Sequence, residues 1–191
     1  MSMRVIGGIY RSRKLKSPQG MKLRPTSDRL RETLFNVLGP RIEGARFADL
    51  YAGTGAVGIE ALSRGAAEVV FVEKQARTAN LIRQNLDSLG ITSGAVILRA
   101  EALRGVEMLA ARHAAEPEQA VDIVFLDPPW TDEKEYPRVL GALGAANFLA
   151  PGARVIVEHR RQHSPALKYG ALRLVRVLEE GDAALSFLQR E

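Results

Sequence analysis

The segment from residue 46 to residue 63 constrains the fold of this chain more than any other. Residues 46–51 form a short apolar run typical of a buried strand, residues 52–58 are rich in glycine, and residues 59–63 suit a helix. Glycine lets the backbone approach a ligand where a side chain would clash. A strand, a glycine loop and a helix in this order are typical of the opening of a parallel α/β sheet that binds a ligand at its strand ends.

Strands and helices continue to alternate after this opening. Apolar runs predict strands at residues 69–72, 95–98, 121–126 and 154–158, and helical spacing predicts helices at 76–89, 103–112 and 134–146. Alternation of this kind implies a mostly parallel, Rossmann-like α/β sheet with helices on both faces. The tail predicts two further strands, 172–178 and 183–188, which complete a seven-stranded sheet with an antiparallel C-terminal edge.

The first quarter of the chain is strongly basic. Residues 1–46 contain 11 Lys and Arg but 3 Asp and Glu, an excess of +8, whereas the whole chain has a net charge of +5. Such an asymmetry is typical of a protein that binds a polyanion, and a solvated basic tail is the alternative. Residues 3–16 predict a β-hairpin arm in which Val5, Ile6, Ile9 and Leu15 pack inward. We therefore expect a basic arm at 1–27 and an α/β domain at 28–191, which begins with a helix at 28–38.

The composition excludes several classes of site. There is no cysteine, so the chain has no disulfide, thiol nucleophile or thiolate ligand, and its three histidines make a poor zinc set. We expect no metal. No apolar run approaches the roughly 18 residues of a membrane helix. We expect a cytoplasmic monomer that does not bind a membrane.

A second informative stretch is Val-Asp-Ile-Val-Phe-Leu-Asp-Pro-Pro-Trp at residues 121–130. Proline has no N–H and cannot continue a ladder, so the strand ends here and Asp127 and Trp130 lie on a stiff loop. A carboxylate, the Pro128 carbonyl and an aromatic plane suit a planar group that carries an exocyclic amine. An ordinary strand ended by a Pro-Pro turn is the alternative.

Acidic residues at three strand ends indicate which ligand the glycine loop binds. Residues 53–58 match G-x-G-x-x-G, which enzymes that bind NAD share. Asp49 would repel a pyrophosphate and attract an ammonium or sulfonium group. Glu73 lies 24 positions further on, where it can accept the hydroxyls of a ribose, and Glu101 can reach an adenine amine. This set favours S-adenosylmethionine over NAD or a glycine turn without a ligand.

These motifs resemble one known family. The stretches at residues 49–55 and 58–66, with Arg-Val-Ile-Gly-Gly at 4–8, Arg-Pro-Thr at 24–26, Arg-Glu-Thr-Leu-Phe-Asn at 31–36 and Phe-Leu-Asp-Pro-Pro at 125–129, are similar to the RsmD family of bacterial 16S rRNA guanine-N2 methyltransferases. Tyr51, Thr54 and Trp130 stand where the family more often has Phe, Ser and Tyr or Phe. The resemblance runs from about residue 3 to 160.

The resemblance implies an enzyme with a class I methyltransferase fold. It would transfer a methyl group from S-adenosyl-L-methionine to the N2 amine of a guanine in 16S rRNA, leaving S-adenosyl-L-homocysteine. The partner would be a small ribosomal subunit or its assembly intermediate.

Together the residues and the resemblance predict three sets of site residues. The catalytic set is Asp127, Pro128, Pro129 and Trp130. The cofactor set is Asp49, Tyr51, Ala52, Gly53, Thr54, Gly55, Glu73, Lys74, Glu101, Ala102 and Asp127. The RNA set is Arg4, Arg11, Arg13, Lys14, Lys16, Arg24, Thr26 and Arg31. A second basic stretch either extends this surface or forms a solvated loop: His159, Arg160, Arg161 and His163. Glu60 is interpreted as part of a solvated face.

Three other functions remain open at this point. An adenine-N6 methyltransferase acting on DNA or RNA would use the same Asp-Pro-Pro-aromatic loop. A methyltransferase for glutamine side chains would leave the basic arm without a polyanion. A nucleic-acid-binding module on an inactive methyltransferase fold is the non-enzymatic alternative. If arm and domain are independent, deletion of residues 1–16 weakens RNA binding and leaves cofactor affinity unchanged.

Overall fold

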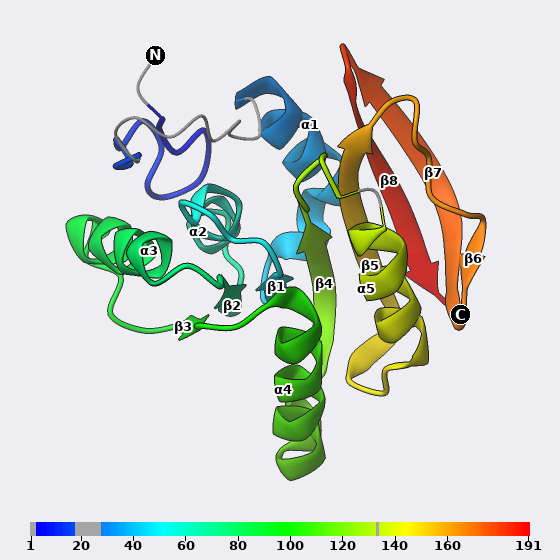
Figure 1. The fold of residues 1–191 in the computed structure, drawn as a ribbon. Helices are drawn as coiled ribbons and strands as arrows, with labels where there is room; N and C mark the ends of the chain where they lie inside the picture. The colour runs from blue at the N-terminus through cyan, green and yellow to red at the C-terminus, as the bar shows by residue number, and fades with distance from the viewer. Residues whose placement is uncertain (1–2, 18–27, 133) are drawn as a thin grey trace. The chain divides into compact units, whose positions relative to one another are not determined.

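The computed structural model describes residues 3–17, 28–132 and 134–191 (Figure 1). The chain divides into two compact units, Met1–Ala100 and Glu101–Glu191, which are described separately below. Arg24 and Thr26, two residues of the predicted RNA set, lie outside the described residues. No helix in the described part of the chain is long and apolar enough to cross a membrane.

The first unit is a three-stranded parallel sheet with helices. The strands β1 (Arg46–Asp49), β2 (Glu68–Val72) and β3 (Ala95–Leu98) lie in the order β3-β2-β1. The helices are α1 (Asp28–Leu38), η1 (Gly39–Ile42), α2 (Ala56–Ser63) and α3 (Ala76–Leu89). Phe47, Phe71, Ile59 and Ile82 are almost completely buried, so the core of the unit is where the sheet meets its helices.

The second unit contains one parallel strand pair followed by an antiparallel edge. Its strands lie in the order β4-β5-β8-β7-β6, and only β4 and β5 are parallel. The strands are β4 (Val121–Leu126), β5 (Leu149–Arg160), β6 (Lys168–Tyr169), β7 (Leu172–Glu180) and β8 (Ala183–Arg190). The helices are α4 (Ala102–Ala115), η2 (Pro117–Gln119) and α5 (Glu135–Ala145).

The predicted number of strands is corrected by one. The described residues form eight strands where seven were predicted, because the two-residue strand β6 pairs with β7 at the C-terminal edge. A strand of two residues is too short to leave an alternating pattern in the sequence. The antiparallel edge itself is confirmed, and β5 begins five residues earlier than predicted.

The N-terminal segment, residues 3–17, folds back on itself antiparallel as predicted, but its ladder is shorter than that of a regular β-hairpin. Its only ladder pairing among the described residues is an isolated antiparallel bridge between Arg4 and Lys14. Val5 and Leu15 are buried as expected, but Ile9 is 79% exposed. Two backbone bonds flank the bridge, from the Val5 N–H to the Arg13 carbonyl at 3.0 Å and from the Leu15 N–H to the Met3 carbonyl at 2.9 Å. The segment also bonds to side chains of α2 and α3, as described below.

Candidate active site

The glycine loop at residues 52–55 joins β1 to α2. The Ala52 N–H donates to the Val72 carbonyl of the neighbouring strand at 3.0 Å, and the Gly55 N–H donates back to the Ala52 carbonyl at 2.7 Å. Gly53 and Gly55 have φ angles of 52° and 79°, which a residue with a Cβ adopts only at a cost. Gly55 is the N-cap of α2. The loop is therefore tight, and neither glycine places a side chain over its backbone.

Asp49, the last residue of β1, is 1% exposed. Its Oδ2 accepts a hydrogen bond from the Gly58 N–H at 3.2 Å, whereas its Oδ1 is buried without a hydrogen-bond partner among the described residues. Burial, with the nearby charge of Glu73, raises the pKa of Asp49 to about 7. A buried acceptor without a partner is the group that a cationic ligand would satisfy, so Asp49 fits the ammonium end of the expected cofactor.

Glu73 follows β2 and is half-buried. Its Oε2 accepts a hydrogen bond from the Gly53 N–H at 3.0 Å, and its Oε1 accepts one from the Gln75 N–H at 2.7 Å. Glu73 therefore connects the glycine loop to the start of α3. Each carboxylate oxygen has a second lone pair, so Glu73 can also accept bonds from ribose hydroxyls. The neighbouring Lys74 is exposed.

Thr54 brings an unexpected neighbour into the same site. Its hydroxyl donates to Met3 Sδ at 3.3 Å, and its carbonyl accepts a hydrogen bond from Asn85 Nδ2 at 3.0 Å. Asn85 was not predicted as a site residue, although it is a polar residue on the apolar face that Ile82, Leu86 and Leu89 define on α3. A buried amide at such a position was the signal available in the sequence. Tyr51 is half-buried.

The second unit contains the other predicted residues. Glu101 is exposed at the N-cap of α4, where its side chain makes no cap hydrogen bond, and Ala102 is buried. β4 ends at Leu126, as the two prolines predict. In the loop that follows, Asp127 and Trp130 are half-buried, Pro128 is buried and Pro129 is exposed.

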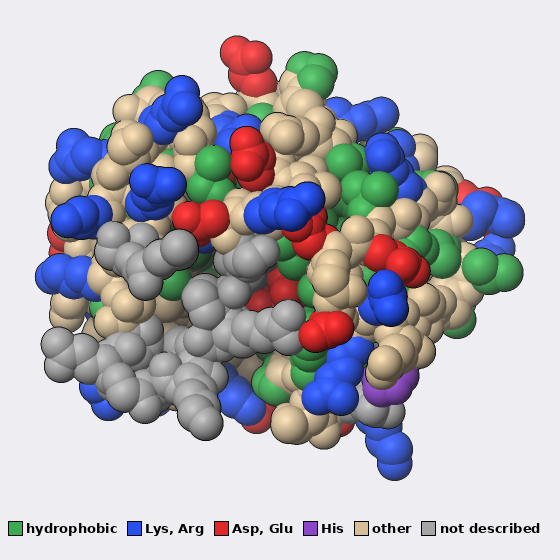
Figure 2. All heavy atoms as spheres, turned by 90° about the horizontal axis from the view of Figure 1, so that it is seen from above, with side chains coloured by type: hydrophobic (Ala, Val, Ile, Leu, Met, Phe, Trp, Pro, Cys, Tyr) green, Lys and Arg blue, Asp and Glu red, His purple; other side chains and the backbone are tan. Residues whose placement is uncertain are grey.

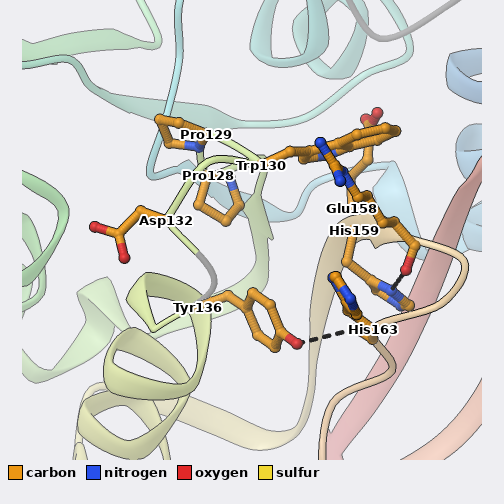
Figure 3. A pocket seen from close by; sticks show the side chains of 9 residues that line it. Pro128, Pro129, Trp130, Asp132, Tyr136, Glu158, His159 and His163 are labelled. Carbon is orange, nitrogen blue, oxygen red and sulfur yellow. Dashed lines mark hydrogen bonds between the residues drawn. The ribbon is translucent and has the colours of Figure 1, made fainter.

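A small pocket lies beside this loop (Figure 3). The Arg160 guanidinium lies over the Trp130 ring, 5.6 Å from its centroid, and the Tyr136 hydroxyl donates to the His163 carbonyl at 3.0 Å. The residues that line the pocket come from the loop after β4, from α5, and from the end of β5 with the residues that follow it: Pro128, Pro129, Trp130, Asp132, Tyr136, Glu158, His159, Arg160 and His163. An aromatic plane and a cation at one opening suit an extruded nucleobase with its phosphate.

His159 holds one wall of the pocket in place and does not extend the RNA surface. It is 2% exposed, its Nε2 shares a 2.8 Å hydrogen bond with Ser186 Oγ, and its Nδ1 lies 2.7 Å from the Arg160 carbonyl. Burial lowers the pKa of this imidazole. The idea that His159 joins a basic surface is therefore wrong.

The predicted RNA residues of the described N-terminal segment are all exposed: Arg4, Arg11, Arg13, Lys14 and Lys16. Figure 2 shows Lys and Arg side chains gathered at its left-hand side, where Figure 1 has this segment and α3. Some of these side chains also make local bonds, such as Arg13 Nη2 to the Ser88 carbonyl at 3.1 Å.

Arg31 differs from the rest of the RNA set. It is completely buried, and its Nη2 donates to the Arg4 carbonyl at 2.6 Å and to Asp28 Oδ1 at 3.0 Å. Its Nε lies 3.8 Å from Glu60 Oε2. These contacts assign Arg31 a structural role in place of the predicted RNA contact. Glu60 is also completely buried, which corrects its assignment to a solvated face.

Comparison with solved structures identifies the class of protein. The Escherichia coli protein yhhF matches with a TM-score of 0.83 and 31% identity, covering 100% of this chain and 99% of that one. An RNA methyltransferase from Salinibacter ruber, solved in complex with S-adenosyl-L-homocysteine, has a TM-score of 0.60 at 14% identity and covers 87% of this chain and 93% of that one. The fold is that of a class I methyltransferase, so the predicted fold class is confirmed.

Sequence comparison then identifies the family. The model of a family described as Conserved hypothetical protein 95 matches residues 3–189. Ribosomal RNA small subunit methyltransferase D of Escherichia coli strain K12 is 35% identical over 189 residues, which is 99% of this chain and 90% of that protein. The chain belongs to this family, the RsmD family of methyltransferases, and the family predicted from the motifs is confirmed.

Proposed function

We propose that this chain transfers a methyl group from S-adenosyl-L-methionine to the N2 amine of a guanine in 16S rRNA. The observation that carries the proposal is the Asp127-Pro128-Pro129-Trp130 loop after β4 in a chain of the RsmD family. A relative that covers 99% of this chain is named as a small-subunit rRNA methyltransferase, which supports RNA as the substrate.

The cofactor would lie against the ends of β1 and β2 in the first unit. When bound, S-adenosylmethionine supplies an electrophilic methyl group on a sulfonium. Asp49 would bind the ammonium group through its buried Oδ1, and that cation would favour the charged form of a carboxyl whose pKa is about 7 without it. The residues 52–55 would contact the methionine end through their backbone, and Glu73 would contact the ribose. Glu101 and Ala102, which belong to the second unit, stay predictions for the adenine.

The loop after β4 would prepare the amine for attack. The lone pair of an exocyclic guanine amine is delocalised into the ring, so the amine is a weak nucleophile. Asp127 and the Pro128 carbonyl would each accept a hydrogen bond from the NH₂ group and turn its lone pair toward the methyl carbon. The Asp127 carboxylate would also stabilise the positive charge that develops on nitrogen as the new bond forms. Correct placement of donor and acceptor supplies much of the rest of the rate.

Trp130 would stack on the target base after it leaves its helix, as enzymes that modify bases require. The exposed basic side chains Arg4, Arg11, Arg13, Lys14 and Lys16 would bind phosphates, which sets affinity but not the choice of sequence. Arg24 and Thr26 stay predictions for the same surface. The division into a basic arm at 1–27 and a catalytic domain at 28–191, and a monomeric state, also stay predictions.

The decisive experiment measures methyl transfer from tritiated S-adenosylmethionine to three substrates. These are small ribosomal subunits, naked 16S rRNA and duplex DNA, all from cells that lack the enzyme, with nucleoside analysis of the product. We expect N2-methylguanosine from a ribosomal substrate. Asp127→Ala should reduce the rate by about 100-fold or more, because it removes a group that stabilises the transition state.

Asp182→Ala is the matched control for Asp127→Ala. Asp182 is an exposed carboxylate between β7 and β8 that does not line the pocket, and its carbonyl accepts a hydrogen bond from the Arg161 N–H at 2.9 Å, a backbone bond that Ala keeps. This variant should retain nearly full activity. If N6-methyladenine appears in place of N2-methylguanosine, the adenine alternative replaces the guanine proposal. If no nucleic acid is methylated while the chain binds cofactor, the chain is a binding module.

A further inference from the structure

One buried side chain joins the N-terminal segment to the glycine loop. Asn85 of α3 is completely buried. Its Oδ1 accepts a hydrogen bond from the Lys16 N–H at 2.7 Å, and its Nδ2 donates to the Lys16 carbonyl at 3.1 Å. The same Nδ2 donates to the Thr54 carbonyl at 3.0 Å. A single amide thus bonds both peptide groups of Lys16 and one peptide group of the glycine loop.

The rest of the segment is held on α2 by polar side chains. The two oxygens of Glu60 accept hydrogen bonds from the Ile6 and Gly7 N–H groups, each at 2.8 Å. Ser63 Oγ donates to the Gly7 carbonyl at 2.5 Å and accepts from the Tyr10 N–H at 3.0 Å. Gly8 approaches the Ser63 backbone so closely, with a φ of 76°, that a Cβ would not fit. The segment is therefore fixed in place against α2 within the first unit.

The glycine loop is held from two directions. Glu73 bonds the Gly53 N–H on one side, and Asn85 bonds the Thr54 carbonyl on the other. The Thr54 hydroxyl also donates to Met3 of the N-terminal segment at 3.3 Å. The orientation of the Thr54 peptide, which lies in the loop assigned above to the methionine end of the cofactor, depends on the segment through two contacts.

We propose that Asn85 couples RNA binding to cofactor binding. This inference rests on the proposed function, in which the segment binds RNA and the loop binds S-adenosylmethionine. RNA bound to the segment would hold the Lys16 backbone against Asn85, and Asn85 would then hold Thr54 in the orientation that binds the cofactor. Coupling of this kind is reciprocal, so the cofactor must strengthen RNA binding by the same factor. The contacts argue against the independence of arm and domain expected from the sequence.

Only an amide can make this set of bonds. Asn85 uses one acceptor and two donor hydrogens, whereas Asp would offer no donor and would bring a charge into a completely buried position. Alanine would remove all three bonds and leave the Lys16 and Thr54 backbone groups without this partner. Asn85 is thus a positioning residue, which acts on the cofactor through Thr54 and does not need to touch it.

The test measures affinities rather than turnover. S-adenosyl-L-homocysteine binding is followed by calorimetry with and without 16S rRNA, and rRNA binding is followed by filter binding with and without S-adenosyl-L-homocysteine. In the unmodified chain we expect each ligand to tighten the other by about 5-fold or more. Asn85→Ala should abolish this mutual effect, and it should raise the KM for S-adenosylmethionine while changing kcat little.

Asn80→Ala is the matched control. Asn80 lies on the same helix but is exposed and bonds only to Arg83 among the interactions described, at 2.8 Å. It should keep both affinities and their coupling. If the unmodified chain methylates rRNA but binds the two ligands independently, the inference fails and the proposed function stands. That measurement needs no variant, so a failure of Asn85→Ala to fold does not protect the inference. If the unmodified chain does not methylate rRNA, the proposed function fails first.

Discussion

At the scale of single residues, Glu60 shows how far a side chain can depart from its expected surroundings. It lies on α2, is completely buried, and bonds the backbone of residues 6 and 7. Its Oε1 pairs with Arg64 Nε at 2.7 Å, and its Oε2 lies 3.8 Å from Arg31 Nε. One carboxylate therefore pairs with two guanidinium groups and fixes the start of the N-terminal segment.

We expect Glu60→Gln to lower the free energy of unfolding by about 3–5 kcal/mol, because removing one partner of a buried ion pair leaves the other charge uncompensated. The buried Arg31 would then have the half-exposed Asp28 as its remaining acidic partner among the pairs described. Urea unfolding measures the change. Glu107→Gln, which breaks an exposed pair with Arg104 on α4, is the control and should cost at most about 1 kcal/mol. Equal losses in the two variants would contradict a special role for Glu60.

Asp49 makes the stability of the free chain depend on pH. Its pKa is raised from 3.8 to about 7, so between these values the folded chain holds a proton that the unfolded chain has released. The contribution of Asp49 to the free energy of unfolding therefore falls as pH rises from about 4 to about 7. Asp49→Asn should remove this slope. Denaturation of both chains across that window checks the sign, and a parallel pH dependence would disprove it.

At the scale of elements, the packing of α2 on β2 depends on one glycine. Gly58 of α2 faces Phe71 of β2 so closely that an added Cβ would overlap the ring. Phe71 is itself completely buried, so it has no space into which to move. The third glycine of the G-x-G-x-x-G pattern is thus explained by helix-to-strand packing and not by contact with a ligand.

Gly58→Ala should destabilise the chain by about 1–3 kcal/mol, the usual cost of overpacking a core. Gly141→Ala is the matched control, because Gly141 lies inside helix α5 and an added Cβ would meet nothing within 4 Å. Alanine there should stabilise the chain by about 0.5–1 kcal/mol through its higher helix propensity. Thermal unfolding of the two variants should shift in opposite directions, and shifts of the same sign would refute this account.

Some elements could be predicted from the sequence, and others depend on contacts between distant parts of the chain. Helix α3 and strand β3 have the predicted bounds, since a β-branched run marks β3 and Gly90 ends α3 with a φ of 71°. β5 is longer than predicted because residues 151 and 152 are Pro and Gly, which break the local pattern, and pairing with β4 and β8 extends the strand. The N-terminal hairpin has a shorter ladder than predicted, and its further bonds go to Glu60 and Asn85, partners that no local pattern reveals.

The residues of the candidate site also differ in how far the sequence predicts them. Asp49, Glu73 and Asp127 could be placed from sequence because each comes at or just after the end of an apolar strand, where parallel strands bring ligands. Asn85 could not, because its role depends on backbone groups 69 and 31 positions away in the chain. The period of an apolar face identifies a buried polar residue but not what it binds.

At the scale of the whole molecule, the proposed RNA-binding charges and the proposed catalytic and cofactor charges lie on different parts of the chain. The exposed basic side chains Arg11, Arg13 and Lys14 lie on the N-terminal segment, whereas the carboxylates assigned to the cofactor and the amine end or follow strands. Contacts to phosphate release counterions, so they make binding depend on salt, and contacts to a base do not.

Replacing Arg11, Arg13 and Lys14 together by Gln should weaken rRNA binding and reduce the slope of log affinity against log salt by about 2 to 3, roughly 0.7–0.9 for each phosphate that the variant no longer neutralises. Filter binding over a series of salt concentrations measures both quantities. A charge-matched comparison is provided by replacing three other exposed residues together by Gln: Arg99, Arg104 and Arg138. If the two triple variants change the slope equally, the N-terminal segment is not the RNA surface.

The contact between Arg160 and Trp130 has a consequence for spectroscopy. Trp130 is the only tryptophan of the chain, and its ring lies beneath a guanidinium at the edge of the pocket shown in Figure 3. The tryptophan emission of the protein therefore originates at the loop after β4, with no background from other indoles. Under the proposed function, stacking of a base on that ring would quench the emission. The ring would then be a built-in optical reporter of the step in which a nucleotide enters, and stopped-flow measurements would time that step without any label.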